Sequence, residues 1–489
     1  MSPLRTLLSR TSPLGAIILT TFVVFAGGSS PALGSALAAL AGTRPQPHPA
    51  GAPISATSAI DSLTPADALG VQVIATSHFL SGASTVKSAG AQFVHLGIEW
   101  RQLAPTDITP DAYNWSQFDS ALSLADSLGY SVMVTLGANP SWAASFNRGP
   151  IDCVAMSRFE EYVDAVVQRY SADPYNVKYW ALYNEPDAVS FTRVTLDCNN
   201  DYDATAFGDH PTEYVATLQA AFNTIKGIDP QAIVLLGGIA YDAFSDEGGY
   251  FNRDFLDQIL TAGAASYFDV MNFHYYPEYD SRWEGLTGLP GLIGKTNTVR
   301  EIMQNHSVSK PIVCSELGDS SGGISGGDTR TEETQSQAVI KHFTRAIAAG
   351  NKIGIWYNMN DYDSPGDPFR NHGLLYTDFT AKPSLSALQT LADNLSGQTY
   401  IRSLLSSEMG ASNLEGYLFW DYGAGQELRI LWSRDGTDQT ITLPLGVTSV
   451  VDKYGTPVAY GATLAIDTEP RLITRDLTIS QVFLPLIAR

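Results

Sequence analysis

The sequence predicts an α/β protein, a (β/α)8 TIM barrel followed by an all-β sandwich domain. Eight apolar runs of strand length recur through the middle of the chain. Amphipathic stretches typical of helices separate these runs, and such an alternation is typical of a parallel sheet covered by helices. After residue 395 the pattern changes to short segments of period-two alternation, which favours the sandwich.

The predicted barrel occupies residues 65–395. A doubly wound open sheet is the alternative, but it would require a glycine-rich phosphate turn after an early strand, and the sequence has none. The predicted strands are residues 71–77, 93–100, 131–138, 177–184, 232–240, 268–276, 311–316 and 353–358. Helix-like stretches include residues 118–128, 156–170, 211–228 and 334–349.

The predicted sandwich occupies residues 396–478. Turn residues at Asp435-Gly436 and Tyr454-Gly455 punctuate its short runs. Residues 479–489 form an apolar tail that is too short to span a bilayer. A last strand and a sorting element both remain open for this tail. The predicted strands of the sandwich are residues 416–420, 428–432, 439–443, 447–451 and 462–466.

Residues 1–38 have the pattern of a secretory signal peptide. Arg5 and Arg10 precede a short apolar stretch at residues 14–26, and small residues follow at 35–38. An uncleaved anchor is the alternative, but the apolar stretch is shorter than the roughly 20 residues that a membrane span requires. We therefore expect an extracellular protein, secreted or on the cell surface, with a Pro/Ala/Ser-rich linker at 39–64 and no stable membrane span after signal removal.

Charge and composition exclude several classes of protein. The 489 residues include 50 acidic and 29 basic side chains, for a formal net charge of -21. Nucleic acid is therefore excluded as a partner, because phosphate binding needs clustered Lys and Arg. A hydrophobic share of 44% with 10% aromatic residues also excludes a disordered chain.

The chain has three cysteines, so one disulfide is allowed outside the cell. Cys314 lies in an apolar run, which predicts a buried reduced thiol. Cys153 and Cys198 lie in loop-like sequence and are the predicted pair.

Two glutamates mark the predicted active site. Glu185 follows the fourth strand and Glu316 ends the seventh, where structure alone gives no reason for a charge. Functional residues of such barrels lie at the C-terminal ends of the strands, and the tips of these two strands can face each other across the barrel mouth. Cleavage of a glycosidic bond requires two carboxylates, one that gives a proton and one that is ionised.

These motifs resemble the clan A retaining glycoside hydrolases, also called the 4/7 superfamily. Asn184-Glu185-Pro186 follows strand four, and Glu316 follows in the position expected on strand seven. The combination of barrel and sandwich is most similar to family 39 xylosidases and iduronidases, or to their family 5 relatives. Further motifs that agree are His274-Tyr275-Tyr276 after strand six, Trp356 at strand eight, and Gly373-Leu374-Leu375 followed by Lys382-Pro383.

The resemblance implies a secreted retaining glycosidase that cleaves β-linked oligo- or polysaccharides. Glu185 would be the general acid/base and Glu316 the nucleophile, with neither cofactor nor metal. Asn184 would hold the sugar's 2-hydroxyl and Tyr276 would hydrogen-bond Glu316. The remaining predicted substrate-binding residues are His274, Trp356 as a stacking platform, Arg101 as an ion pair near the nucleophile, and Trp142, which either forms a platform or packs a loop.

Three alternative interpretations remain at this stage. The chain could be a catalytically decayed carbohydrate-binding barrel at the cell surface. The acidic loop at 361–367 suggests calcium, but Pro365 stands where an Asp or Asn is expected and the closing Glu is missing, so a loop bordering the cleft is favoured. The glycine-rich residues 318–328 lack the Lys-Ser/Thr ending of a phosphate loop and predict a mobile lid.

Overall fold

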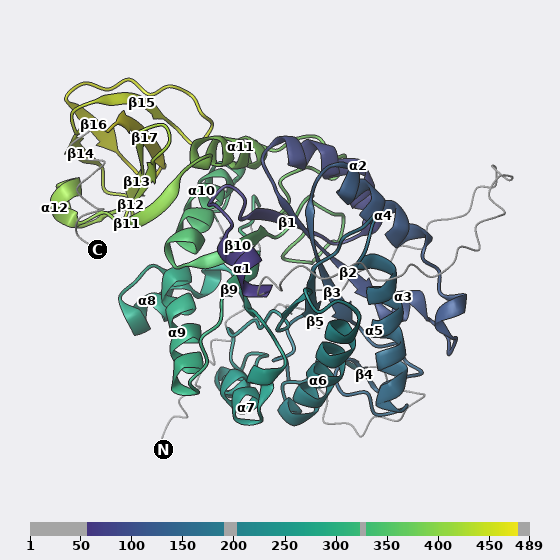
Figure 1. Cartoon of the computed structure of the whole chain (residues 1–489). Coiled ribbons are helices and arrows are strands. Elements are labelled where there is room, and N and C mark those ends of the chain that lie inside the picture. Colours follow the sequence, from purple (N-terminus) through teal and green to yellow (C-terminus); the bar gives the residue numbers. More distant parts are fainter. Residues whose placement is uncertain (1–55, 190–202, 323–328, 478–489) are drawn as a thin grey trace, which may run out of the picture.

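The computed structural model describes residues 56–189, 203–322 and 329–477. Eight parallel strands form the central sheet in the order β7-β5-β3-β2-β1-β10-β9-β8. Isolated parallel bridges Leu235–Val270 and Ile239–Phe273 join the two ends of this order, so the sheet closes (Figure 1). The predicted (β/α)8 barrel is therefore confirmed.

The barrel strands lie close to the predicted ranges. The first begins and ends earlier than expected, because helix α2 already starts at Thr76. The strands are β1 (Leu69–Val73), β2 (Phe93–Glu99), β3 (Ser131–Gly137), β5 (Tyr179–Leu182), β7 (Ile233–Leu235), β8 (Met271–Tyr275), β9 (Ile312–Leu317) and β10 (Asn351–Trp356). The covering helices are α2 (Thr76–Ser88), α4 (Ser116–Ser127), α5 (Met156–Tyr170), α6 (Pro211–Ile228), α7 (Phe255–Thr261), α9 (Gly291–Asn305), α10 (Glu332–Ala348) and α11 (Pro383–Leu395).

Shorter elements extend the loops. A small parallel pair, β4 (Phe146–Arg148) with β6 (Asp203–Ala206), lies outside the barrel sheet. The additional helices are α1 (Ala56–Asp61), α3 (Trp100–Leu103), α8 (Asp280–Thr287) and α12 (Ser406–Met409).

Strand residues alternate between two apolar clusters. Phe93, Met133 and Val313 belong to an inner cluster enclosed by the barrel, as do Ile353 and Ile355 of β10. The residues between them pack in the larger cluster between the strands and the helices. Because side chains alternate with a period of two, this division decides which strand-end residues reach the barrel mouth.

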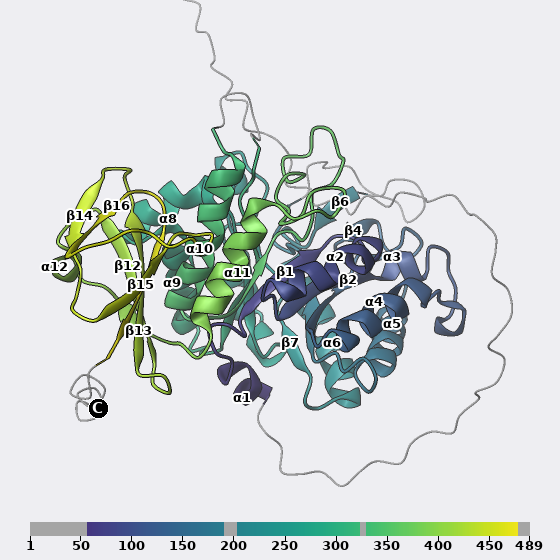
Figure 2. The same cartoon turned by 90° about the horizontal axis from the view of Figure 1, so that it is seen from above.

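The C-terminal part forms antiparallel sheets, as predicted. A five-stranded sheet has the order β11-β12-β13-β17-β15, and β14 pairs with β16. Figures 1 and 2 show these sheets beside α10. The strands are β11 (Thr399–Ser403), β12 (Leu414–Asp421), β13 (Gln426–Ser433), β14 (Gln439–Thr442), β15 (Val447–Val451), β16 (Thr463–Ile466) and β17 (Arg471–Asp476).

Buried ion pairs join the sandwich to the barrel. Arg345 of α10 donates to both carboxylate oxygens of Glu415 of β12, at 2.8 and 2.9 Å. Tyr454 donates to Glu333 of α10 at 2.9 Å. The sandwich thus packs directly against the helix that follows β9.

The cysteines agree with the sequence as far as the described residues extend. Cys314 is buried and free, and Cys153 is disulfide-bonded. Its predicted partner Cys198 lies outside the described residues, as do the predicted signal peptide, residues 39–55 of the linker and the C-terminal tail. Within the described ranges, none of the helices is both long and apolar enough to cross a membrane.

Candidate active site

The two predicted glutamates meet at the mouth of the barrel. Glu185 lies three residues beyond β5, and Glu316 lies near the end of β9. Each is only 1% exposed. An oxygen of each carboxylate lies within 4.8 Å of the other and of a ring nitrogen of His274. The fold therefore brings together two buried carboxylates that are 131 residues apart in the chain.

The backbone at Glu185 adopts a conformation that non-glycine residues rarely take. Its φ is 48°, in the left-handed region, and such a conformation costs about 1–3 kcal/mol. The Glu185 amide donates to Gly238 O at 2.9 Å. Asp187 accepts from the amides of Ala240 and Tyr241, at 3.0 and 2.8 Å. These bonds hold the strained turn against the segment after β7. The sequence analysis did not identify Asp187.

His274 of β8 lies between the two glutamates. Its Nδ1 is 3.2 Å from Glu185 Oε1 and 3.4 Å from Glu316 Oε2. Burial disfavours the charged ring, but the carboxylates of Glu316 and Glu185 outweigh it and raise the pKa of His274. The predicted His274 thus contacts both acidic groups.

Tyr276 donates to Glu316 Oε2 at 2.9 Å, as expected for the predicted hydrogen bond. Burial raises the pKa of Glu316, and the nearby charge of Glu185 adds to this rise. His274 and the Tyr276 hydroxyl oppose it by stabilising the ionised form. The net effect is that the pKa of Glu316 lies above that of an ordinary carboxyl group.

Two arginines lie on the Glu185 side of the site. Arg148 of β4 places Nη1 4.0 Å from Glu185 Oε2 and donates to the Asn184 carbonyl at 3.3 Å. Sequence reasoning missed Arg148, because a three-residue strand in a loop carries no recognisable pattern. The predicted Arg101 instead bonds Glu99, with Nε 2.7 Å from Oε2. Burial raises the pKa of Glu99, and Arg101 opposes this shift.

A polar layer supports the glutamates from inside the barrel. His95 Nε2 lies 2.6 Å from Thr135 Oγ1, and His95 Nδ1 lies 3.4 Å from the Ser315 carbonyl. Burial, together with the charge on His274, lowers the pKa of His95 to about 3, so its ring is neutral. Asn272 accepts from the Ser315 amide at 3.2 Å, which fixes the strand just before Glu316.

Several buried polar atoms of the site lack hydrogen-bond partners among the described residues. They include Glu185 Oε2, Glu316 Oε1, His274 Nε2 and the side-chain nitrogen of Asn184. Buried polar groups are nearly always satisfied, so unsatisfied ones deserve an explanation. Donors and acceptors gathered beside two carboxylates suit a ligand rich in hydroxyl groups.

The predicted stacking role of Trp356 is corrected by the structure. Trp356 is fully buried in the outer cluster, where it stacks on His342 of α10 with ring centroids 6.3 Å apart. Its Nε1 donates to the His372 carbonyl at 2.9 Å. The neighbouring residue, Tyr357, contacts Tyr276 instead, with centroids 6.2 Å apart. Tyr357, which directly follows β10, is thus the aromatic residue that lies beside Tyr276, the hydrogen-bond partner of Glu316.

For Trp142 the structure supports loop packing. Its Nε1 donates to the Ala104 carbonyl at 2.8 Å, and its ring packs edge-on against Trp100 with centroids 5.2 Å apart. The Arg158 guanidinium lies over the same ring, 5.4 Å from its centroid. These contacts favour loop packing, one of the two alternatives that the sequence left open for Trp142.

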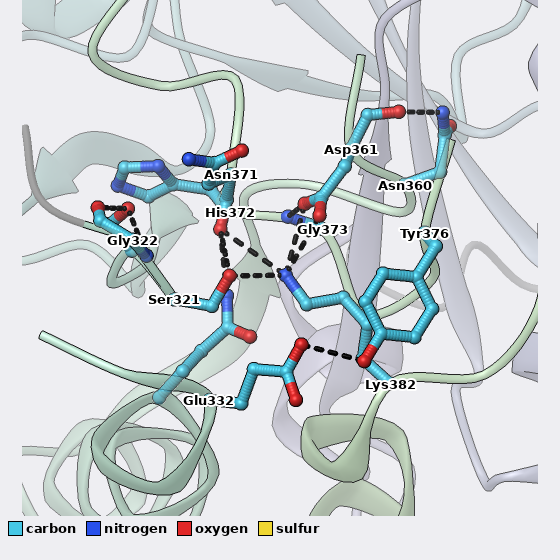
Figure 3. A network of polar contacts seen from close by, with 12 residues as sticks. Ser321, Gly322, Glu332, Asn360, Asp361, Asn371, His372, Gly373, Tyr376 and Lys382 are labelled. Carbon is cyan, nitrogen blue, oxygen red and sulfur yellow. Dashed lines mark hydrogen bonds and ion pairs between the residues drawn. The ribbon is translucent and has the colours of Figure 1, made fainter.

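A buried lysine organises the loops after β9 and β10. Figure 3 shows Lys382 pointing between Asp361 and Ser321. Its Nζ donates to both Asp361 oxygens at 3.0 Å and to Ser321 Oγ at 2.7 Å. The ammonium therefore neutralises the first carboxylate of the segment considered for calcium. Part of the predicted lid, residues 323–328, lies outside the described residues, while Ser321 is held to the Asn371 carbonyl at 3.0 Å.

The arrangement can support two kinds of chemistry. Paired carboxylates can share a proton transfer and a nucleophilic attack on one ligand atom. Glu185, His274 and Glu316 also offer three potential metal-ligand atoms within 4.8 Å of one another.

Comparisons with known proteins agree with the fold and identify the family. A sequence model described as Cellulase (glycosyl hydrolase family 5) matches residues 75–362. A search of curated proteins gave no match. The family match covers the whole span from α2 to the loop after β10, and both glutamates fall within it.

Solved structures share the fold over most of the chain. A family 39 glycoside hydrolase from the gut symbiont Bacteroides cellulosilyticus WH2 is 18% identical, with a TM-score of 0.62 over 84% of this chain and 81% of that one. The catalytic domain of GH30 xylanase C from Talaromyces cellulolyticus is 13% identical, with a TM-score of 0.54 over 84% and 96%. A GH39 β-xylosidase from Caulobacter crescentus is 14% identical, with the same TM-score and the same coverage.

Proposed function

Because the chain belongs to the cellulase family, glycosyl hydrolase family 5, and is a glycoside hydrolase, we propose that it cleaves β-linked glycans with retention of anomeric configuration. The observation that carries this proposal is the closeness of the two carboxylates, since one oxygen of Glu185 lies within 4.8 Å of one oxygen of Glu316. Retaining enzymes hold the two groups about 5–5.5 Å apart, whereas inverting enzymes need roughly 6.5–9.5 Å to admit a water. The short separation favours direct attack by a carboxylate.

In the first step, Glu316 attacks the anomeric carbon and Glu185 protonates the departing oxygen. Tyr276 and His274 favour the ionised form of Glu316, which the attack requires. The unpartnered side-chain nitrogen of Asn184 can donate to the sugar's 2-hydroxyl, a contact that strengthens as the transition state gains oxocarbenium character. The products are a glycosyl ester on Glu316 and the free leaving group.

In the second step, Glu185 accepts a proton from water, which attacks the same anomeric carbon. Once Glu316 is esterified, its negative charge no longer repels the Glu185 carboxylate. Arg148, 4.0 Å from Glu185 Oε2, stabilises the negative charge of that carboxylate. Attack by water releases the sugar with its original configuration and regenerates Glu316 as a carboxylate.

The test is a matched set of variants assayed on aryl β-glycosides and β-linked polysaccharides. Glu316→Ala should lose about 10⁴-fold or more in kcat, and azide should restore turnover with formation of the inverted glycosyl azide. Glu427→Gln is the control, since Glu427 is a buried carboxylate bound by Arg429 and Arg475 in the sandwich. Full turnover by Glu316→Ala, or an inverted first product from the wild type by NMR, would refute the proposal.

We also propose that the protein acts outside the cell. The signal-like pattern of residues 1–38 and the disulfide-bonded Cys153 support export, because disulfides persist in oxidising compartments. N-terminal sequencing of the protein recovered from culture medium should find a chain that starts near residue 39. Recovery of the full-length chain from the cytoplasm alone would contradict this proposal.

A further inference from the structure

The spacing of Glu185, His274 and Glu316 fits a metal ion as well as a sugar. Tetrahedral Zn²⁺ with nitrogen and oxygen ligands at about 2.0–2.2 Å places neighbouring ligand atoms roughly 3.3–3.5 Å apart. His274 Nδ1 lies 3.2 Å from Glu185 Oε1 and 3.4 Å from Glu316 Oε2. The two distances from His274 Nδ1 to the carboxylate oxygens are therefore already close to the separation that tetrahedral zinc requires. The third distance, between one oxygen of Glu185 and one oxygen of Glu316, is at most 4.8 Å. Rotation of one carboxylate would shorten this distance to the required length.

The burial of these groups also suits a metal. All three side chains are about 99% buried, and Glu185 Oε2 and Glu316 Oε1 have no hydrogen-bond partner among the described residues. Two carboxylates at this depth share His274 and an arginine 4.0 Å away, and a divalent cation would balance their remaining charge. Arg148 approaches Glu185 from its Oε2 side, which leaves Oε1 facing His274.

The other ring nitrogen of His274 has a neighbour suited to a metal-bound histidine. Such histidines usually donate their second ring N–H to a nearby acceptor. His274 Nε2 and Ser315 Oγ both lack partners among the described residues. Both border the small space beside Gly238: a Cβ there would lie 2.2 Å from Nε2 and 2.9 Å from Oγ. Nε2 is thus free to carry the ring hydrogen, which leaves Nδ1 unprotonated for the metal.

From this geometry we propose that Glu185, His274 and Glu316 form a Zn²⁺ site that reversibly inhibits the enzyme. One imidazole and two carboxylates match the ligands that Zn²⁺ prefers, with water in the fourth position. Ca²⁺ takes six to eight oxygen ligands, and Mg²⁺ keeps an octahedral shell of oxygens, so neither fits three compact ligands. The inhibitory effect rests on the proposed function, because bound Zn²⁺ occupies both the nucleophile and the acid/base.

The test measures zinc binding without relying on catalysis. The full chain, freed of metal with EDTA, is titrated with ZnCl₂ by calorimetry, and MgCl₂ and CaCl₂ are titrated in parallel. We expect one saturable Zn²⁺ per chain and no saturable heat from the other two. Glu185→Gln and His274→Gln should each weaken zinc binding by more than about 10-fold, and Ser315→Ala by a smaller factor.

His306→Gln is the matched control. His306 Nε2 lies 2.7 Å from Asp257 in a more exposed pair without a third ligand, so its loss should leave binding unchanged. X-ray absorption of the zinc-loaded wild type should show nitrogen and oxygen neighbours at about 2.0–2.2 Å. This measurement does not depend on the folding of any variant. A sulfur neighbour, the absence of saturable binding, or unchanged affinity in a folded Glu185→Gln protein would overturn the proposal.

Activity measurements separate this proposal from the proposed function. Zn²⁺ should inhibit hydrolysis of an aryl glycoside competitively, and EDTA should restore the full rate. A chain that binds one Zn²⁺ through these residues but hydrolyses no glycoside would refute the proposed function alone. A chain that hydrolyses glycosides and binds no Zn²⁺ would refute the zinc site alone.

Discussion

Gly238→Ala should impair catalysis through a single methyl group. The added Cβ would lie 2.2 Å from His274 Nε2, and ordinary contacts begin at 3.4 Å, so the ring must move by about 1.2 Å. His274 now holds both glutamates at 3.2 and 3.4 Å, and this displacement breaks or distorts both contacts. A misplacement of about 1 Å can lower the rate about 10²-fold, which corresponds to about 2.7 kcal/mol of barrier.

The assay compares kcat and thermal unfolding of Gly238→Ala with those of Gly227→Ala. Gly227 lies in α6 with open space where its Cβ would be, so that variant should keep full activity and gain about 0.5–1 kcal/mol of stability. Gly238→Ala should lose about 1–3 kcal/mol of stability from overpacking but remain folded. Wild-type kcat in a folded Gly238→Ala protein would refute the idea that His274 must keep its position.

Three further predictions concern the hydrogen bonds and buried ion pairs. Tyr276→Phe removes the hydrogen bond that Tyr276 donates to Glu316, which contributes about 1.5–3 kcal/mol. The pKa of Glu316 should therefore rise, and the acidic limb of the pH profile of kcat/KM should move up by about one to two pH units. An unmoved limb would contradict this. Lys382→Met leaves Asp361 buried without its cation and should lower the free energy of unfolding, measured in urea, by about 3–5 kcal/mol. The double variant with Asp361→Leu should recover most of this lost stability. Glu415→Gln should lower the melting temperature in calorimetry, because the ion pair of Glu415 with Arg345 joins the two domains. Because the hydrogen bonds of Glu415 are to Arg345 and Tyr417 rather than to either glutamate of the active site, kcat at 25 °C should stay within about twofold.

The sequence predicted the fold and the two carboxylates because these leave local patterns. Each barrel strand is a short apolar run between amphipathic helices, so its position can be read without tertiary information. Glu185 and Glu316 interrupt or end such runs with a charge, and barrel topology then places both strand ends at one mouth. His274 and Tyr276 were predicted from the family resemblance instead, and the structure places His274 on β8 and Tyr276 directly after it, in contact with the carboxylates.

The sequence could not show which side chains at the end of β10 point into the barrel and which point toward the helices. A shift of one residue turns every following side chain to the opposite face of a strand. In β10 the residues Ile353 and Ile355 face the inner cluster, so Trp356 faces α10 and Tyr357 lies beside Tyr276. Because both faces of a parallel barrel strand are apolar, the sequence does not show which set of alternate residues points inward. Arg148 was missed for a related reason, since its position depends on a pairing between two distant loops.

The treatment of buried charge distinguishes the active site from the rest of the barrel. Lys382 lies 3.0 Å from Asp361, and Lys295 lies 2.5 Å from Asp242, so these buried carboxylates have a close cation. At the barrel mouth, in contrast, two buried carboxylates face each other and share one imidazole, with His274 Nδ1 3.2 Å from Glu185 and 3.4 Å from Glu316. Arg148 lies 4.0 Å from Glu185. Such an arrangement opposes folding, since like charges repel at low dielectric. Two buried carboxylates that share a single close imidazole stay responsive to a proton, a sugar or a metal ion.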